Sequence, residues 1–467
     1  MHRQIRLLAV ALLTFSFASA VHAQSASGGN FPLPEKYFPT LQTLIDSASK
    51  QSPRMVARNT ENAVAEANRI SARAGQLPAA GGYASYYPWV TENRAVAGST
   101  PGGGSLPDAV LHPKKLSYSF SITQPIFHWG ALANSTKIGE LGQKITEGQS
   151  ADVYRLLVDE IRGQFLQVVT LKAGLARARF NQKIADDQLT LARSKLEKHV
   201  ISEADMFTPT MTAEQARLAS DRVADEYENS KIYLGKLCGT APLTDDQIPN
   251  DIPPVTPASS AIQSVVAEFT GEPELKTYSM QVMRDQIETE RLNYKVANTR
   301  LRPKVNLALG TSQDEFSYSV NIADKYKVRQ YFAGVIVNWT LFDGFQTRSA
   351  KTVSLARRRQ LEQTYKDQTA DTIAAINSQV RQLEFSARNL AIVERLLGSA
   401  NDILTLKKED MARGVSSDVE VNAAQLGLYD SQIAAYTARN EYMMRVSRLL
   451  SATLKDPALV NIPVTRR

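Results

Sequence analysis

Residues 345–413 read FQTRSAKTVSLARRRQLEQTYKDQTADTIAAINSQVRQLEFSARNLAIVERLLGSANDILTLKKEDMAR, and this run decides the fold. It contains no proline, as an unbroken helix requires. Its apolar residues step by three and four and later by seven, in the order Ile373, Ile376, Val380, Leu383, Ala387, Leu390, Leu397 and Leu404. This spacing predicts a helix with an apolar seam against a neighbouring helix, as in a coiled coil. At about 1.5 Å per residue, the helix would be roughly 100 Å long, too long for a compact globule.

The chain repeats one plan twice. A second proline-free long helix is predicted at 131–199, with a seam through Leu157, Ile161, Phe165, Val168, Leu171 and Leu175. In each half, a shorter helix and two β segments precede the long helix, and a turn and another shorter helix follow it. The shorter helices are expected at 40–77 and 203–237, and at 261–301 and 417–454. Because two shorter helices together approach the length of a long one, we expect them to stack end to end beside it. The sequence therefore predicts a mainly α fold of duplicated long-helix hairpins with a small β part.

The predicted domain boundaries follow from a signal peptide and from the ends of the two repeats. Arg3 and Arg6, an apolar run at 7–18 and the small-x-small site Val21-His22-Ala23 predict a cleaved signal peptide. No later stretch reaches about 18 uninterrupted apolar residues, so no membrane-spanning helix is expected. The predicted domains are the signal peptide 1–23, the first repeat 24–237, the Pro-rich inter-repeat segment 238–260, the second repeat 261–455 and the C-terminal tail 456–467.

Four segments alternate apolar and polar residues, at 116–123, 305–310 and 331–341 and more weakly at 83–89. The pattern suits a lipid-facing barrel wall with a wet interior, and equally a soluble sheet with one buried face. Four strands cannot close a barrel, because single-chain outer-membrane barrels begin at about eight strands. Two copies would supply eight strands and three copies twelve. Side chains fill an eight-stranded barrel, so a conducting duct favours twelve.

Residues 91–113 separate the first pair of β segments and are predicted to form an exposed loop without a strand. Gly102, Gly103 and Gly104 favour a flexible connection there. The run lacks the Gly-Lys-Ser/Thr sequence and the helix start of a phosphate-binding loop, so it is not expected to bind nucleotide.

Two phrases close the second β segment of each half, Gln124-Pro125-Ile126-Phe127 and Thr340-Leu341-Phe342-Asp343-Gly344. A third run, residues 414–425, reads GVSSDVEVNAAQ and follows the second long helix. Together with the duplicated element order, which covers nearly all of the chain after the signal peptide, these phrases resemble the TolC-like outer-membrane efflux proteins.

The resemblance implies a homotrimer with four strands per chain in a twelve-stranded transmembrane β-barrel. It implies an α-helical tunnel that extends from the outer membrane into the periplasm, with a belt formed by the termini and residues 238–260. Such a channel is a passive duct for drugs, toxins or polypeptides. Its partners are a periplasmic adaptor (membrane fusion protein) and an inner-membrane transporter, in a tripartite efflux or type I secretion system.

The resemblance also places the adaptor-docking surface at the two helix-to-helix turns. In the second repeat these residues would be Gly414, Val415 and Ser416. In the first repeat the matching residues would be Val200, Ile201 and Ser202, with Val200 where the family usually has glycine. Pro209 follows this first turn, and Thr208 with Pro209 could cap the returning helix, which would make the first turn longer than the second.

Rings of acidic side chains narrow the tip in many relatives, a few residues past this turn. The candidates for such a periplasmic gate are Glu420 and Asp418 in the second repeat, and Asp205 and Glu203 in the first. Ala423 stands at the family's second acidic position, so one ring is absent or displaced to Asp418. Three copies of one carboxylate would repel one another and bind cations. The alternative is a solvated helix start, where acidic residues complement the helix dipole.

Residues for catalysis or metal binding are scarce. Beyond the signal peptide the histidines are His112, His128 and His199, far apart in sequence, and Cys238 is the single cysteine. No HExxH, GxSxG or P-loop motif occurs, so neither an enzyme nor a cofactor or metal site is expected. The formal net charge is +7, but the charges are scattered, which argues against nucleic-acid binding.

Two other classes of protein remain open at this point. A soluble periplasmic coiled-coil scaffold or adaptor would also have long helices, although adaptors carry one helical hairpin flanked by β domains rather than two hairpins and four alternating strands. A secreted hydrolase is weaker, because the sequence offers no set of nucleophile, base and orienting residue.

Overall fold

Two long helices dominate the computed structural model, which describes residues 31–89, 92–94, 109–111, 114–317 and 325–460. α4 (Ala131–Glu197) and α8 (Gln346–Ala412) have 67 residues each, so both predicted long helices are confirmed to within two residues at their ends. The predicted signal peptide and most of the 91–113 segment lie outside the described residues. Among the described residues, no helix is both long enough and apolar enough to cross a membrane.

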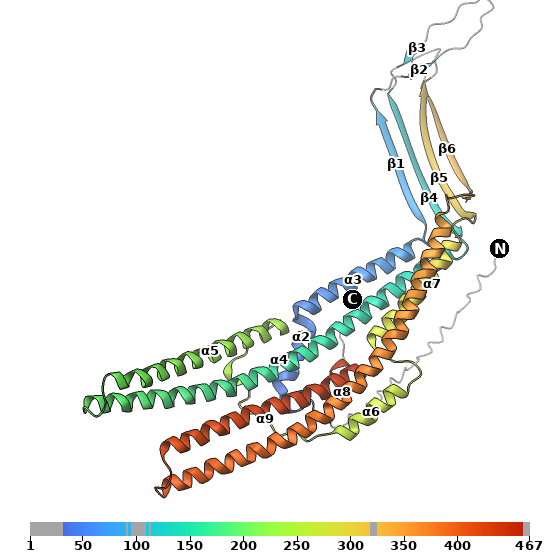
Figure 1. The fold of residues 1–467 in the computed structure, drawn as a ribbon. Coiled ribbons are helices and arrows are strands. Elements are labelled where there is room, and N and C mark those ends of the chain that lie inside the picture. Colours follow the sequence, from blue (N-terminus) through green and yellow to red (C-terminus); the bar gives the residue numbers. More distant parts are fainter. Residues whose placement is uncertain (1–30, 90–91, 95–108, 112–113, 318–324, 461–467) are drawn as a thin grey trace, which may run out of the picture. The chain divides into compact units, whose positions relative to one another are not determined.

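Shorter helices lie end to end along each long helix (Figure 1). α3 (Pro53–Ala74) and α5 (Phe207–Cys238) pack along α4, and α7 (Tyr278–Asn298) and α9 (Asp418–Ala452) pack along α8. α4 also contacts α7 and α9, so it is the helix that joins the two repeats. The predicted duplicated hairpins and their end-to-end stacking are therefore confirmed.

The first helix of each repeat is broken, which corrects the single helices predicted at 40–77 and 261–301. In the first repeat α1 (Pro34–Tyr37) and α2 (Pro39–Gln51) precede α3, and the helical path breaks at Ser52. Pro53 restricts the residue before it to an extended conformation, and Ser52 has a ψ of 132°. In the second repeat α6 (Ser259–Gly271) ends before Pro273, and α7 begins after its N-cap Thr277.

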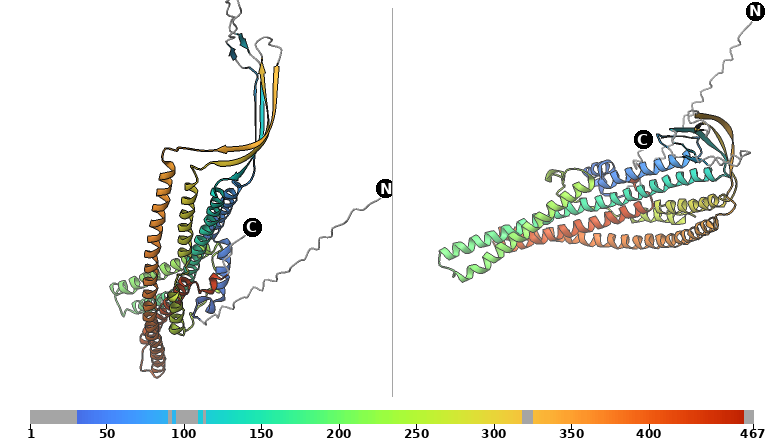
Figure 2. Two further views of the ribbon diagram at one scale, coloured as in Figure 1. Left: turned by 90° about the vertical axis from the view of Figure 1, so that its right-hand side faces the viewer. Right: turned by 90° about the horizontal axis from the view of Figure 1, so that it is seen from above.

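All four long strands form one antiparallel sheet in the order β1-β4-β5-β6. The strands are β1 (Ala79–Tyr87), β4 (Lys115–Phe127), β5 (Lys304–Ser317) and β6 (Lys325–Asn338). All four strands meet the helices at one end of the helical part (Figure 2). β1 and β5 follow α3 and α7, and β4 and β6 precede α4 and α8. Beyond them, β2 (Glu92–Arg94) pairs with β3 (Ala109–Leu111), so the prediction that 91–113 contains no strand is wrong for these residues.

The strand register gives the sheet one mainly apolar face and an opposite, mixed face, which carries most of its serine, threonine and asparagine residues beside Tyr83, Phe332 and Ile336. On the apolar face, Ala333 pairs with Leu309, which in turn pairs with Ile122. The next row toward the helices joins Val335 to Leu307. The opposite face carries Ser119, Ser121, Thr123, Asn306 and Ser312, which alternate with the apolar-face residues along β4 and β5. Val335 is 61 % exposed in the single chain, so the apolar face has no cover from the described part of this chain.

The best-buried part of the chain lies around the middle of α4. Leu157, Ile161, Phe165 and Val168 of the predicted seam are completely buried there. α9 packs against them with its own fully buried residues, among them Tyr442, Met443 and Val446. The hydrophobic core is therefore strongest where the two repeats meet.

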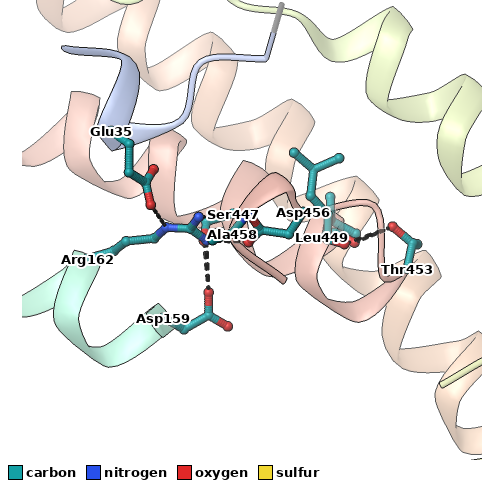
Figure 3. Close-up of polar contacts among 9 residues, drawn as sticks. Glu35, Asp159, Arg162, Ser447, Leu449, Thr453, Asp456 and Ala458 are labelled. Carbon is teal, nitrogen blue, oxygen red and sulfur yellow. Dashed lines mark hydrogen bonds and ion pairs between the residues drawn. The ribbon is translucent and has the colours of Figure 1, made fainter. Parts of the chain in front are cut away.

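Arg162, only 1 % exposed, links segments near the two ends of the described residues at this core (Figure 3). Its Nε donates to Glu35 Oε1 of α1 at 2.6 Å, and its Nη2 donates to Asp456 Oδ1 at 2.9 Å. Its Nη1 donates to Ser447 Oγ of α9 at 2.7 Å. Asp456 also accepts from the backbone N–H of Ala458 and so starts the short helix η3 (Pro457–Leu459). One guanidinium thus holds α1, α4, α9 and the C-terminal segment together.

Two further basic residues fix the inter-repeat segment. Arg439 of α9, 4 % exposed, makes two hydrogen bonds to the Glu394 carboxylate of α8 and one to the backbone carbonyl of Ile252. Lys172 of α4 donates to the backbone carbonyl of Asp245 at 2.8 Å. Because charge-assisted hydrogen bonds are among the stronger ones, this proline-rich segment is held against the helices despite its few regular elements.

Replacing Arg162 with Ala should strongly destabilise the folded chain. The change would leave the carboxylates of Glu35 and Asp456 buried without their partner, at a cost of about 3–5 kcal/mol. Arg155→Ala is the matched control, because the Arg155–Asp152 pair is partly exposed and should contribute under about 1 kcal/mol. Urea unfolding of the detergent-solubilised protein, followed by circular dichroism, measures both. Equal losses in the two variants would contradict the role assigned to Arg162.

Candidate functional site

Residues with positive φ mark the ends of the long helices, and they occur at equivalent places in both repeats. Each such residue of the first repeat has a counterpart 215 positions later. The pairs are Trp129 with Gly344, Gly130 with Phe345, His199 with Gly414, and Gly239 with Leu454. These pairs include every positive-φ residue in the described part of the chain. The two hairpins therefore match residue for residue, with no net insertion between the strand-to-helix junction and the end of the returning helix.

The turn at each tip reverses the chain through one left-handed residue. In the second repeat this residue is Gly414 (φ 77°), and the Val415 N–H then donates to the Asp410 carbonyl at 2.8 Å. In the first repeat it is His199 (φ 57°), and the Val200 N–H donates to the Lys195 carbonyl at 2.9 Å. The counterpart of Gly414 is thus His199. The prediction that Val200 occupies the position of Gly414 is wrong by one residue.

Both tips continue with the same serine cap. Ser417 Oγ accepts from the Glu420 N–H at 3.4 Å, and Ser202 Oγ accepts from the Asp205 N–H at 3.3 Å. Asp205 returns a hydrogen bond, since its Oδ2 accepts from the Ser202 N–H at 2.9 Å. Asp205 and Glu420, predicted separately as gate residues, are therefore equivalent positions at two helix starts, 215 apart like the turns. The hydrogen bonds from Ser202 lower the pKa of Asp205.

The two turns differ in length as predicted. α9 begins at Asp418, directly after its cap, whereas in the first repeat the equivalent residues form a short 3-10 helix, η1 (Ala204–Met206), and α5 begins only at Phe207. The segment between the two α-helices therefore spans 413–417 in the second repeat and 198–206, including η1, in the first. Pro209 lies in the first turn of α5, but the helix starts just before Thr208 rather than after it.

Lys407 of α8 is the tip residue that sequence reasoning missed. Its Nζ lies 2.6 Å from Glu420 Oε2, and Ser416 Oγ donates to the same oxygen at 3.1 Å. The hydrogen bond from Lys407 is the main cause of a lowered Glu420 pKa. The equivalent position in the first repeat is Ala192, so Asp205 has no matching cation. No sequence pattern separates Lys407 from the other polar residues of α8.

Apolar side chains are exposed at both tips, where the surrounding surface is polar. Val415 is 74 % exposed and Val200 is 67 % exposed. The large exposed apolar residues beside these two valines are Phe207, Met211, Met411 and Val419. We call these six residues the tip surface. Exposed apolar clusters of this kind mark sites of protein interaction.

A groove of about 440 Å³ lies above the tips, between the two hairpins. Its wall is formed by α4, α5 and α9, with Ala185, Ala216 and Leu426 among the lining residues. The hairpins also meet through Arg177 of α4, whose Nη2 donates to Asp430 Oδ2 of α9 at 3.2 Å.

His128 and Cys238, which were considered for catalysis or metal binding, are placed as structural residues. His128 Nε2 lies 2.9 Å from Asn306 Oδ1, so it links β4 to β5 at the strand-to-helix junction. Cys238 is buried, and burial raises the pKa of its thiol to about 11. Within the described ranges, no group of three or more His, Cys, Asp or Glu side chains could hold a metal ion.

Two long-helix hairpins joined to a four-stranded sheet are the architecture of a family of export channels. The family model for outer membrane efflux proteins matches residues 44–240 and 276–453, which cover both repeats. The chain belongs to this family. It is a channel protein of the cell outer membrane that extends into the periplasm.

Known proteins similar to this chain agree with that assignment. The Alkaline protease secretion protein AprF of Pseudomonas aeruginosa is 20 % identical over 340 residues, or 71 % of this chain and 68 % of AprF. The Campylobacter jejuni CmeC outer membrane channel has a TM-score of 0.67 at 13 % identity, covering 90 % of this chain and 86 % of CmeC. The Vibrio cholerae outer membrane protein VceC has a TM-score of 0.62 at 14 % identity, covering 91 % and 97 %. At these identities the structures establish the fold.

Proposed function

We propose that three copies of this chain form a passive export duct. In this proposal, the twelve strands close a transmembrane β-barrel and the long helices form a tunnel through the periplasm. A periplasmic adaptor and an inner-membrane transporter complete a tripartite efflux or type I secretion system. The observation that carries the proposal is the packing of α4 against α7, the helix that precedes the strands of the other repeat. The duplication predicts the same kind of partner for α8, and the described part of the chain does not supply it.

The helices that precede the strands also correspond between repeats. β1 begins at Ala79 and β5 at Lys304, so α3 and α7 are related by 225 positions. The step changes from 225 to 215 because the connection between β1 and β4 is the longer one. α4 packs against both α3 and α7, whereas α8 packs extensively against α7 but not against α3.

The contact between α4 and α7 is close. A Cβ atom on Gly148 of α4 would lie 2.8 Å from Val282 Cγ2 of α7. The equivalent positions are Gln363 on α8 and Ala57 on α3, and both are exposed in the single chain. α3 exposes Val56 and Val64 on the same side, and α8 exposes Val353. A second copy whose α3 lies along α8 would therefore repeat the internal contact between chains.

Sheet edges support the same closure. β1 and β6 are the outer strands of the larger sheet, and in the described part of the chain neither has a partner on its outer side. Unpaired edges are a liability that closure into a barrel removes. Three copies supply twelve strands, which leave an open interior, whereas side chains fill eight. The mixed face with Ser119 and Ser121 would then line the lumen, and the apolar face with Val335 would contact lipid.

The proposed cargo class is drugs, toxins or polypeptides. AprF is named as a protein for the secretion of alkaline protease, which favours polypeptides. We also propose that residues 1–23 are removed as a signal peptide and that 24–237 and 261–455 form the two repeats. Residues 238–260 and the tail 456–467 would then form a belt around the tunnel, a position supported by the bonds that fix Ile252 and Asp456.

The tip surface is the proposed docking site for the adaptor. Gly414, Val415 and Ser416 in one repeat, and Val200, Ile201 and Ser202 in the other, present it through turns with the same hydrogen bond. Exposed valines on two rigid turns suit hydrophobic docking by a helical partner.

Acidic side chains beside the tip surface form the proposed cation-sensitive gate. Glu420 is its main residue, with Asp418, Asp205 and Glu203 as further members. Lys407 would tune the gate, because it neutralises Glu420 within the same hairpin.

A disulfide between copies tests the trimer. Ala57→Cys and Gln363→Cys on one chain should cross-link under mild oxidation and give covalent dimers and trimers on a denaturing gel. The native Cys238 is buried and adds little background. Each single-cysteine variant serves as the control and should remain monomeric on the gel. A double variant that also stays monomeric, or that stops at dimers, would contradict the proposed ring.

Conductance in planar bilayers tests the gate. Glu420→Gln should weaken block by divalent cations about fivefold, the effect of one charge at close range. Lys407→Gln should strengthen the block by a similar factor, since it leaves Glu420 without its cation. Glu409→Gln, at a carboxylate of the same tip that pairs with Arg413, is the control and should change little. Unchanged block in both Glu420→Gln and Lys407→Gln would remove Glu420 from the gate.

A further inference from the structure

Basic residues gather where the helices meet the sheet. Four segments form this region, 69–79, 124–138, 294–304 and 339–353, and we call it the junction collar. Asp343 is its single acidic residue. Against it stand nine basic residues, Arg69, Arg73, Lys137, Lys295, Arg300, Arg302, Lys304, Arg348 and Lys351. Elsewhere the acidic and basic residues of the chain are nearly balanced, so the collar is a local excess of positive charge.

Aromatic side chains position part of this charge. The Arg302 guanidinium lies over the Trp129 ring, 5.0 Å from its centroid. Trp129 Nε1 donates to the Pro303 carbonyl at 2.7 Å, and Trp339 Nε1 donates to the Leu301 carbonyl at 3.0 Å. The two tryptophans thus hold the turn between α7 and β5 from both sides. A guanidinium stacked on an indole keeps its N–H edges available for an anion.

Few carboxylates of the described chain act on the collar: Glu66 lies 3.8 Å from Arg69, and Asp343 interacts electrostatically with Arg300. Asp343 Oδ2 accepts from the Thr347 N–H at 2.9 Å, so it serves as a cap at the start of α8. Arg300, Arg302 and Arg348 are all exposed, and no carboxylate of the described residues lies within ion-pair distance of them.

The other end of the strands is different. Lys115 lies 3.8 Å from Asp314 across the sheet, and Lys327 lies 3.3 Å from Glu315. Two of the basic residues at that end therefore have carboxylate partners across the sheet, whereas Arg300, Arg302 and Arg348 have none within ion-pair distance among the described residues.

Exposed apolar and aromatic residues of the same segments form a belt within the collar. Leu341 is 72 % exposed and Phe342 is 70 % exposed. The belt also includes Ile126, Phe127, Trp339 and Phe345. Aromatic residues of membrane proteins concentrate at the level of the lipid headgroups. If the sheet lies in the membrane, the collar lies at the phosphates of the periplasmic leaflet.

We propose that the junction collar binds the headgroup phosphates of anionic phospholipids in the periplasmic leaflet, through Arg300, Arg302 and Arg348. The inference rests on the proposed placement of the sheet as a transmembrane barrel. Guanidinium groups match the geometry of phosphate oxygens and bind them through paired N–H donors. Basic residues at a membrane surface attract anionic lipid, each by a few-fold in affinity. The belt anchors the wall at this depth, and the collar selects the lipid around it.

Quenching of tryptophan fluorescence by brominated lipid tests the proposal. The chain has three tryptophans, and Trp89→Phe leaves Trp129 and Trp339, both beside the collar. This protein is reconstituted into phosphatidylcholine vesicles that contain brominated phosphatidylglycerol or brominated phosphatidylcholine. We expect phosphatidylglycerol to compete for the sites near the tryptophans at least about fivefold better than phosphatidylcholine.

Two sets of variants separate the collar from general surface charge. Arg300→Gln, Arg302→Gln and Arg348→Gln together should bring the preference to about one. Arg381→Gln with Arg388→Gln removes two exposed charges farther along α8 and should leave the preference unchanged. Trimer stability on an unheated gel confirms that each variant is assembled. A collar variant that keeps the full preference would overturn the proposal.

The remaining outcomes identify which inference fails. Equal quenching by the two brominated lipids would overturn the lipid site but leave the sheet in the membrane. No quenching by either lipid would overturn the barrel placement and the lipid site together. Loss of the preference in inorganic phosphate, but not in chloride of equal ionic strength, would show a site for free phosphate and overturn the assignment to lipid.

Discussion

A 67-residue helix exposes more side surface than one partner helix can cover, and this constraint governs the whole chain. Each long helix needs shorter helices stacked along it and a further neighbour on its other side. The chain supplies all of these neighbours for α4 but not for α8. Duplication therefore does not make the chain self-sufficient. It leaves exposed faces on α3 and α8, and in the described part of the chain unpaired outer edges on β1 and β6, which the other copies would cover in the proposed trimer.

Much of the fold could be predicted from the sequence because its signals are long and periodic. The seam through Leu383 and Leu390 identified α8, and alternation identified the strands. The breaks at Ser52 and before α7 were missed, although Pro53 and Pro273 signal them, since a continuous apolar pattern outweighed a local restriction. The role of Arg162 could not be predicted, because its partners Glu35 and Asp456 stand far from it in the chain.

The tips show how local chemistry changes the interpretation of a motif. Sequence reasoning found the turns and their acidic residues, but the 215-residue register was visible only in the backbone. His199 adopts the conformation of Gly414 without being glycine, so residue identity could not reveal the match. The register makes Asp205 and Glu420 equivalent, and Lys407 distinguishes them. The two repeats therefore carry different charge at equivalent positions. Lys407 neutralises the carboxylate of Glu420, whereas the carboxylate of Asp205 has no matching cation.

In the proposed assembly, the channel wall forms only when several chains come together. The mass of the extracted particle tests this assembly most directly. Native mass spectrometry of the protein, extracted from outer membranes in detergent, should give a mass equal to three mature chains. The species should keep that mass on dilution and should precipitate when the detergent is removed, because its apolar sheet face would lose its cover. A single chain that stays in solution without detergent would contradict the account, since the exposed faces of α8 and of the sheet would then need no partner.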